Sequence, residues 1–215
     1  MIQLYDYWRS SASYRVRIAL SLAGLEWTSV PVDLLAGDNR SSEHLARNPQ
    51  GLVPVLDIGN VRLTQSLAII EYLNEVHGLG LLPADPVARA RTRAIAYAVA
   101  VDIHPVCNIS VVQYAAEHSG DPTLNRTWMQ HFIGKGLAAV EEMIDGGAFC
   151  IGESISMADV CLYPQLYNAQ RWSVSLGRFP RIRAVMETLS EIGAFAQQHP
   201  DQAKAPLRRT AAQLR

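Results

Sequence analysis

The sequence predicts an α/β domain over residues 1–82, followed by an all-helical domain over residues 87–215. Strand-like apolar runs alternate with helix-like amphipathic stretches through the first region, whereas only helical patterns follow it. Between the two regions, "HGLGLLPADP" at residues 77–86 is rich in glycine and proline, which is typical of a linker.

The first domain is expected to have the order βαβ, a short helix, then ββα. Gly24 is placed to close the first helix, and Gly59-Asn60 separates two short apolar runs, which predicts a hairpin. The expected elements are a strand at 2–7, a helix at 15–23, a strand at 27–34, a short helix at 42–47, strands at 53–59 and 61–64, and a helix at 66–77.

The second domain is expected to contain four helices. Pro105 should kink or interrupt the first of them, because proline lacks the N–H group that a helix interior needs. "SMAD" predicts a capping box at the start of the third, with Ser156 as N-cap and Asp159 at the third helical position. The expected helices are residues 87–116, 124–144, 157–170 and 180–192.

Composition excludes several classes of protein. Nineteen basic residues against twenty acidic ones give a net charge of -1, which argues against a nucleic-acid binder. No run of apolar residues is long enough to predict a membrane span, and the N-terminus does not resemble a secretion signal. Cys107, Cys150 and Cys161 have no disulfide-like or metal-like spacing and the six histidines are scattered. We expect a cytoplasmic protein without a metal site.

A cluster of polar residues, "RSSAS" at residues 9–13, lies where the first helix begins. The unpaired N–H groups and the dipole of a helix N-terminus favour an anion there. Three interpretations fit: Ser13 caps the helix while Ser10 and Ser11 face solvent; the cluster binds a phosphate, although no glycine-rich loop is present; or a serine hydroxyl donates to a thiolate. These five residues alone leave the choice open.

Pro54 opens the third expected strand, in "LVPVL". A proline there either protects a sheet edge or forms a cis peptide bond. In the second case the N–H and C=O groups of Val53 would be free to pair with an extended, peptide-like ligand.

The segment "WRSSASYRVRIAL" at residues 8–20 closely resembles the signature of the zeta-class glutathione transferases, also known as the maleylacetoacetate isomerase family. The segments "NPQGLVPVL", "QSLAIIEYL", "LLPADP", "SMADVCLYPQ" and "NAQRW" also look like that family and follow in its order. The resemblance spans nearly the whole chain. It implies a thioredoxin-like α/β N-terminal domain that binds glutathione and an all-α C-terminal domain, which together make the glutathione transferase fold.

The resemblance also implies roles for residues of the first domain. Ser10 is expected to be the main hydrogen-bond donor to the glutathione sulfur, with Ser11 close by. Val53 should pair through its backbone with the cysteinyl unit of glutathione. Gln65 and Ser66, at a helix start, should hold the γ-glutamyl carboxylate.

Further roles are implied for both domains. His104 and Asn108, on the helix expected to line the cleft, should contact glutathione. Arg9 and Arg171 should bind a small dicarboxylate substrate, because guanidinium groups suit carboxylates. Ala12 stands where the family more often has a cysteine, whose role there resembles that of an accessory group.

Four further basic residues lie near these positions in the sequence. Arg15 and Arg17 belong to the same segment and are expected to form internal ion pairs. Arg40 and His44, in the polar stretch before the third strand, are candidates for holding the glycyl carboxylate of glutathione.

The function implied by the resemblance is a glutathione-dependent cis–trans isomerase that converts maleylacetoacetate to fumarylacetoacetate in tyrosine and phenylalanine catabolism. Glutathione is then a cofactor, and a homodimer is expected by resemblance only. Three alternatives stay open: a maleylpyruvate isomerase, a zeta-class transferase acting on α-halo acids, and a non-catalytic binding protein with the same fold.

Overall fold

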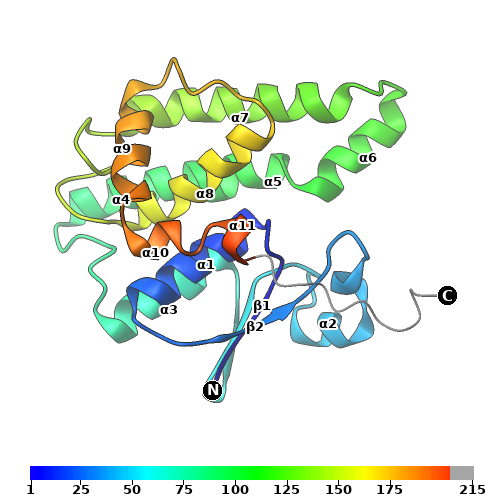
Figure 1. The fold of residues 1–215 in the computed structure, drawn as a ribbon, viewed down its shortest axis with the longest axis horizontal. Coiled ribbons are helices and arrows are strands. Elements are labelled where there is room, and N and C mark those ends of the chain that lie inside the picture. The colour runs from blue at the N-terminus through cyan, green and yellow to red at the C-terminus, as the bar shows by residue number, and fades with distance from the viewer. Residues whose placement is uncertain (204–215) are drawn as a thin grey trace. The chain divides into compact units, whose positions relative to one another are not determined.

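The computed structural model describes residues 1–203, which form two compact units (Figure 1). The first unit comprises Met1–Leu73 together with the described residues from Gln197 onward, and the second comprises Asn74–Ala196. Leu81, in the expected linker, is tied to the second unit because its N–H donates to the Asn74 side chain at 2.7 Å. The predicted boundaries at 82 and 87 stay a prediction, and the part of the predicted helical domain beyond Ala203 lies outside the described residues.

The first unit is built on a mixed four-stranded sheet with the order β2-β1-β3-β4. The strands are β1 (Ile2–Asp6), β2 (Thr28–Pro31), β3 (Val55–Ile58) and β4 (Val61–Thr64). β1 runs parallel to β2 because a helix connects them, whereas β3 and β4 form the predicted antiparallel hairpin. Leu4 and Leu56 face each other across β1 and β3 and are fully buried. The predicted βαβ–ββα order is confirmed.

Three helices pack around this sheet: α1 (Ser11–Leu22), α2 (Ser42–Arg47) and α3 (Ser66–His77). Figure 1 shows α1 and α3 on one side of the sheet and α2 on the other. A short 3-10 turn, η1 (Asp38–Arg40), leads into α2. The expected start of the first helix at residue 15 is wrong by one turn, because the polar cluster is itself helical from Ser11 onward.

A buried ion pair joins β1 to α1. Arg17 Nη1 donates to Asp6 Oδ2 at 2.6 Å, and both side chains are almost fully buried. Ser29 on β2 donates to the other oxygen of Asp6 at 2.7 Å. Arg17 also donates to the carbonyl of Trp8 at 3.0 Å, in the loop between β1 and α1. The ion pair expected for Arg17 is confirmed, and it holds three elements of the first unit together.

In the residues that the structure describes, the regular elements of the second unit are all helices. Pro105 interrupts the predicted helix at 87–116, as expected: a π-helical turn precedes it, and a break at Cys107 and Asn108 follows it. The elements are α4 (Pro86–Tyr97), the π-helix η2 (Ala98–Ile103), α5 (His104–Val106), α6 (Ile109–Ser119), α7 (Leu124–Met143), α8 (Met157–Arg171), α9 (Pro180–Ser190) and α10 (Gly193–Ala196). A last short helix, α11 (Pro200–Ala203), belongs to the first unit.

One helical stretch, Pro86–Ser119, has the length and composition that a membrane span would need, with a mean hydropathy of 1.6. A third of its apolar window is buried (33%), and the core helix of a soluble protein passes the same test, so this is weak evidence. The break at Cys107 and Asn108 would leave backbone groups without partners in lipid. The predicted absence of a membrane span stays a prediction.

The predicted capping box opens α8. Asp159 is fully buried, and its Oδ2 accepts hydrogen bonds from the N–H and the hydroxyl of Ser156 at 2.8 and 2.6 Å. Its Oδ1 also accepts the N–H of Cys150 at 2.8 Å, a contact that the sequence pattern does not predict. The carboxylate therefore fixes both the start of the helix and the loop that precedes it.

We predict that Asp159→Asn lowers the free energy of unfolding by about 2–4 kcal/mol, because an amide cannot accept on both sides and leaves a buried N–H unpaired. Chemical denaturation followed by circular dichroism measures this. Glu153→Gln, an exposed acid in the same loop, is the matched control and should change stability by less than about 0.5 kcal/mol. Equal stability of the two variants would contradict the prediction.

Candidate functional site

Ser10 is the N-cap of α1. Its backbone is extended (φ −66°, ψ 120°) and its Oγ accepts the N–H of Ser13 at 3.2 Å. Ser13 is therefore not the cap, and the interpretation in which it caps the helix is wrong. In the described part of the chain, no acceptor holds the Ser10 hydroxyl proton, which can therefore be donated to a ligand.

Ser11 is the first residue of α1 and is 6% exposed. The N–H groups of the first helical turn lie beside both serines, so a negative charge placed here gains from the helix dipole as well as from a hydroxyl donor. Ala12 follows within the helix, so no thiol lies in the cluster. The geometry is that of an anion site, which can hold a phosphate, a carboxylate or a thiolate.

Arg9 is held by its aromatic neighbours. Its Nη2 donates to the hydroxyl of Tyr7 at 2.9 Å, and its guanidinium lies over the Trp8 ring at 4.9 Å from the ring centre. Cation–π contact of this kind orients a guanidinium without neutralising its charge. Arg9 is therefore a pre-oriented cation one residue before Ser10.

A second anion-binding helix start lies at α3. Ser66 is its first residue and is 6% exposed, and its Oγ accepts from Nη1 of Arg15 at 3.2 Å. Gln65, just before it, has a φ of 67°, a left-handed conformation that costs energy for a residue other than glycine. Such strain gathers at ligand sites. The Gln65 amide donates to Gln50 Oε1 at 2.6 Å, so Gln50 joins this part of the site.

Val53 precedes a cis peptide bond to Pro54. β3 lies between β1 and β4, so the edge-strand alternative for Pro54 is wrong and the cis alternative is confirmed. Within residues 1–203, no acceptor is placed for the N–H of Val53.

The remaining predicted site residues belong to the helical unit. His104 is the first residue of α5 and is half-buried. Asn108 is the N-cap of α6, and its Oδ1 accepts the N–H of Ser110 at 3.1 Å, so its amide group remains a donor. Arg171 is the last residue of α8, where its guanidinium lies over the ring of Tyr167 at 5.9 Å.

Two observations change the expectations for neighbouring residues. His44 is 1% exposed and its Nε2 bonds the carbonyl of Leu52 at 3.0 Å, so it is not available to hold a ligand's glycyl carboxylate. Arg40 is exposed at the end of η1 and stays a candidate. Sequence reasoning missed Gln50 and the link between Arg15 and Ser66, because the residues of each pair lie 15 and 51 positions apart.

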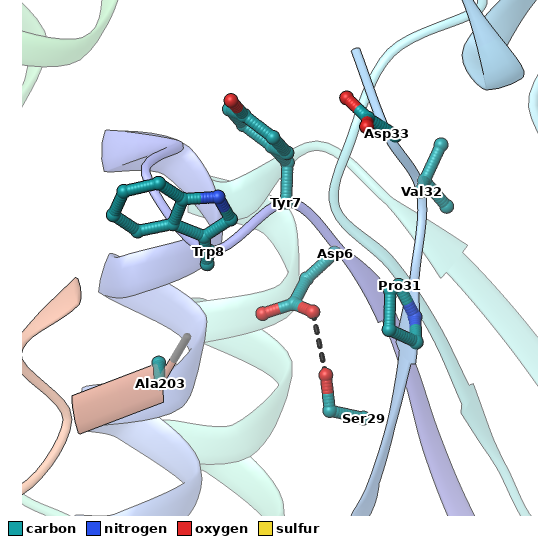
Figure 2. A pocket seen from close by; sticks show the side chains of 8 residues that line it. All are labelled: Asp6, Tyr7, Trp8, Ser29, Pro31, Val32, Asp33 and Ala203. Atoms are coloured by element: carbon teal, nitrogen blue, oxygen red, sulfur yellow. Dashed lines mark hydrogen bonds between the residues drawn. The ribbon is translucent and has the colours of Figure 1, made fainter. Parts of the chain in front are cut away.

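A small pocket opens beside the carboxyl ends of β1 and β2 (Figure 2). Trp8 and Tyr7 project from the loop after β1, and Asp33 lies across from them. The pocket offers about 20 Å³, enough for a water molecule and too little for a tripeptide. Its lining is Asp6, Tyr7, Trp8, Ser29, Pro31, Val32, Asp33 and Ala203. In the described residues, no group of three potential metal ligands is found.

Two family models match the chain: the glutathione S-transferase N-terminal domain over residues 1–75 and the glutathione S-transferase C-terminal domain over residues 127–188. The chain is 61% identical to the maleylacetoacetate isomerase of Rhizobium meliloti (strain 1021), over 94% of this chain and 97% of that protein. It is 41% identical to the maleylacetoacetate isomerase of Rattus norvegicus, over 92% and 91%.

Solved structures agree with these matches. The maleylacetoacetate isomerase of Methylobacterium extorquens AM1, crystallised with malonate and glutathione, matches with a TM-score of 0.90 and 37% identity, over 95% of this chain and 98% of that one. A holo maleylpyruvate isomerase, described as a bacterial zeta-class glutathione S-transferase, matches with a TM-score of 0.89 and 38% identity, over 93% and 97%. The chain therefore belongs to the glutathione S-transferase family, and within it to the zeta-class maleylacetoacetate isomerases.

Proposed function

We propose that the chain is a glutathione-dependent isomerase that converts maleylacetoacetate to fumarylacetoacetate. The observation that carries the proposal is the Ser10 hydroxyl, which caps α1 while its proton stays available at the helix N-terminus. The 61% identity to a maleylacetoacetate isomerase supports the choice of substrate. Bound glutathione in solved relatives supports the choice of cofactor.

The helix start can supply the energy that a thiolate needs. Lowering a thiol pKa from about 8.5 by two pH units takes about 2.7 kcal/mol. A helix N-terminus contributes about 0.3–2 kcal/mol and a hydrogen bond to a charged acceptor about 1.5–3 kcal/mol. The Ser13 N–H also polarises the Ser10 hydroxyl, because a group that accepts a hydrogen bond donates a stronger one. Together these contributions suffice, whereas neither the dipole nor the hydroxyl alone does so comfortably.

The chain's own thiols are poorly suited to this chemistry. Burial raises the pKa of Cys107 to about 11. Burial, and next the charge of Asp159, raise the pKa of Cys150 well above its usual value. Cys161 is buried as well. The nucleophile therefore has to be brought by a ligand, which fits glutathione.

The proposed reaction begins with addition of the glutathione thiolate to the cis double bond, which is conjugated to a carbonyl. The electron pair of the double bond moves to the carbonyl oxygen and forms an enolate, and the former double bond rotates. The enolate then returns its electron pair, re-forms the double bond as trans and expels the thiolate. No atom is gained or lost, so glutathione is regenerated. Donors or cations close to the enolate oxygen lower the barrier.

The remaining site residues take the following proposed roles. Ser11 assists Ser10, and the N–H of Val53 pairs with the cysteinyl unit. Gln65 and Ser66 hold the γ-glutamyl carboxylate at the start of α3, where N–H groups and the dipole favour an anion. His104 and Asn108 contact glutathione, and Arg9 and Arg171 bind the carboxylates of the substrate. These proposed roles rest on the type and position of each residue. For Arg9 they also rest on the orientation of its guanidinium over the Trp8 ring.

A second substrate, maleylpyruvate, is favoured by one observation, the likeness to a holo maleylpyruvate isomerase at 38% identity. Both substrates would offer a cis double bond, a conjugated carbonyl and carboxylates to the same thiolate.

We also infer the setting of the enzyme: the cytoplasm, the catabolism of tyrosine and phenylalanine, and a homodimer. An apolar surface on α4 and η2 supports self-association, since Tyr97 is 42% and Val101 55% exposed. Exposed apolar patches on soluble proteins often mark interaction surfaces.

The proposed function predicts that purified protein converts maleylacetoacetate to fumarylacetoacetate only when glutathione is added. Product formation followed by chromatography, with and without glutathione, checks this, and maleylpyruvate is assayed in parallel. Turnover without glutathione would contradict the mechanism. If the protein converted only maleylpyruvate, the assigned substrate would change to maleylpyruvate and the proposed thiolate mechanism would stand.

Ser10→Gly separates the role of this serine as a helix cap from its role as a hydrogen-bond donor to the thiolate. Glycine at an N-cap lowers helix stability by only a few tenths of a kcal/mol, so the variant mainly removes the hydroxyl donor. We predict that it raises the pKa of the bound glutathione thiol by about one to two pH units and lowers kcat about 10- to 150-fold. Ultraviolet titration of the bound thiolate and steady-state kinetics measure these effects. Ser41→Gly, which removes the corresponding cap from α2, is the control and should leave both unchanged. An unchanged thiolate in Ser10→Gly would transfer the role to Ser11.

The cysteines are predicted to react slowly in the folded protein. With a pKa of about 11, Cys107 holds a few hundredfold less thiolate near pH 8 than an ordinary thiol. Titration with an aromatic disulfide reagent should detect almost no thiol until denaturant is added, and then three. Rapid modification of a native thiol would contradict the prediction.

A further inference from the structure

The carbonyl oxygen of Leu52 accepts two side-chain hydrogen bonds. Nε2 of His44 bonds it at 3.0 Å and Nδ2 of Asn48 donates to it at 2.9 Å. Because a carbonyl oxygen can only accept, Nε2 of His44 carries the proton. A carbonyl oxygen has two lone pairs, so both are used. His44 and Asn48 are 1% and 2% exposed, so the two donor side chains are shielded from water although Leu52 itself is 40% exposed.

This double contact also orients the next amide. The peptide bond between Leu52 and Val53 is planar, and in it the C=O and N–H groups point in opposite directions. Holding the Leu52 oxygen from two sides therefore fixes the direction of the Val53 N–H. That N–H has no acceptor among residues 1–203. It is the group that the proposed function assigns to the cysteinyl unit of glutathione.

The preceding residues of the loop are held equally firmly. Oδ1 of Asn48 accepts the N–H of Gln50 at 3.1 Å, and Asn39 donates to the carbonyl of Gly51 at 2.7 Å. Gly51 has a φ of +64°, and a Cβ there would lie 3.1 Å from the backbone oxygen of Asn39. The side chains of Asn39, on η1, and Asn48, at the C-cap of α2, therefore hold the loop that leads to Leu52.

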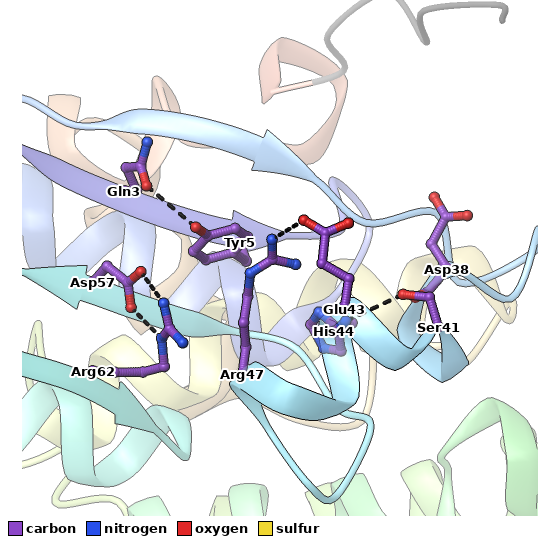
Figure 3. A network of polar contacts seen from close by, with 9 residues as sticks. All are labelled: Gln3, Tyr5, Asp38, Ser41, Glu43, His44, Arg47, Asp57 and Arg62. Carbon is purple, nitrogen blue, oxygen red and sulfur yellow. Dashed lines mark hydrogen bonds and ion pairs between the residues drawn. The ribbon is translucent and has the colours of Figure 1, made fainter.

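Packing at this buried position does not by itself require a histidine. It is the third residue of α2, and the hydroxyl of the N-cap Ser41 accepts its backbone N–H (Figure 3). Its Nδ1 is buried and has no partner in the described part of the chain. A buried polar atom without a partner costs free energy that a leucine of similar size would avoid. Packing alone thus does not account for the histidine, whereas its bond to Leu52 does.

We propose that His44 and Asn48 are positioning residues for glutathione: they hold the Leu52 carbonyl so that the Val53 N–H points at the cysteinyl carbonyl of the bound tripeptide. The proposal rests on the proposed function, since it takes glutathione as the ligand. It adds residues that do not touch the ligand and act through the Leu52–Val53 peptide.

The test compares His44→Leu, which removes the donor, with His44→Gln, whose Nε2 can keep it. Asn48→Asp is a second variant, since it keeps the acceptor for Gln50 but turns a donor into an acceptor facing Leu52. Calorimetry measures binding of glutathione and of γ-glutamylcysteamine, which keeps the thiol but lacks the cysteinyl carbonyl. Thermal melting of each variant reports folding, and kinetics at saturating glutathione report kcat.

We expect His44→Leu and Asn48→Asp to weaken glutathione binding about five- to tenfold, the usual size of one lost hydrogen bond. Binding of γ-glutamylcysteamine should change less than about twofold, kcat should stay within about twofold, and His44→Gln should bind glutathione almost as the original protein does. If the variants weakened the binding of glutathione and of γ-glutamylcysteamine equally, the proposal would be overturned. A general loosening of the loop would then explain the result.

Unchanged glutathione binding in both His44→Leu and Asn48→Asp would also overturn the proposal, while leaving the proposed function intact. Failure of the original protein to bind glutathione at all would overturn the proposed function and this inference with it. The two failures are therefore distinguishable.

Discussion

The ion pair between Asp6 and Arg17 is the interaction on which the geometry of the first unit depends. It links the end of β1 to the second turn of α1, and Arg17 also donates to the carbonyl of Trp8 within the intervening loop. The loop is thereby closed against the helix that follows it, so that Ser10 falls on the N-cap. Removing one partner of a buried pair strands the other charge, which usually costs several kcal/mol. The pair therefore holds the segment that carries Ser10 in one conformation.

The proposed function divides the recognition of glutathione between two helix starts. α1 offers hydroxyl groups and N–H groups around Ser10, and α3 offers Ser66 behind the strained Gln65. Both helices lie on the same side of the sheet (Figure 1). A polar helix N-terminus by itself is a common feature of globular proteins. In the proposed function, glutathione uses both helix starts and the backbone N–H of Val53, which has no acceptor among residues 1–203.

The α2 side of the sheet carries a different kind of polar surface (Figure 3). Arg47 pairs with Glu43 and lies over the ring of Tyr5, and Arg62 donates two hydrogen bonds to Asp57, which lowers the pKa of that carboxyl. One partner of each pair is exposed to solvent, so the pairs contribute little to stability. The bonds of His44, on α2, and of Asn48, at its C-cap, differ from these pairs because both donor side chains are almost fully buried.

Much of the fold follows from local pattern. Alternating apolar runs and the Gly59-Asn60 turn predict the sheet, and the spacing of Ser156 and Asp159 predicts the capping box, because such signals act within a few residues. The first helix starts earlier than predicted because Ser10, five residues before the expected start, supplies the cap. Contacts between distant residues could not be predicted in this way: the bonds from Gln65 to Gln50 and from Arg15 to Ser66 depend on how the chain folds back, which no short pattern encodes.

The first unit is completed by residues from the other end of the chain. Tyr14 on α1 meets the ring of His199 edge-on, and the backbone of Gln198 lies within reach of Arg17. During synthesis the helical unit, Asn74–Ala196, must leave the ribosome before these partners exist. The segment that bears Ser10 is thus synthesised first, but its contacts with His199 and Gln198 form last. A product truncated before these residues would contain the serine cluster without those contacts.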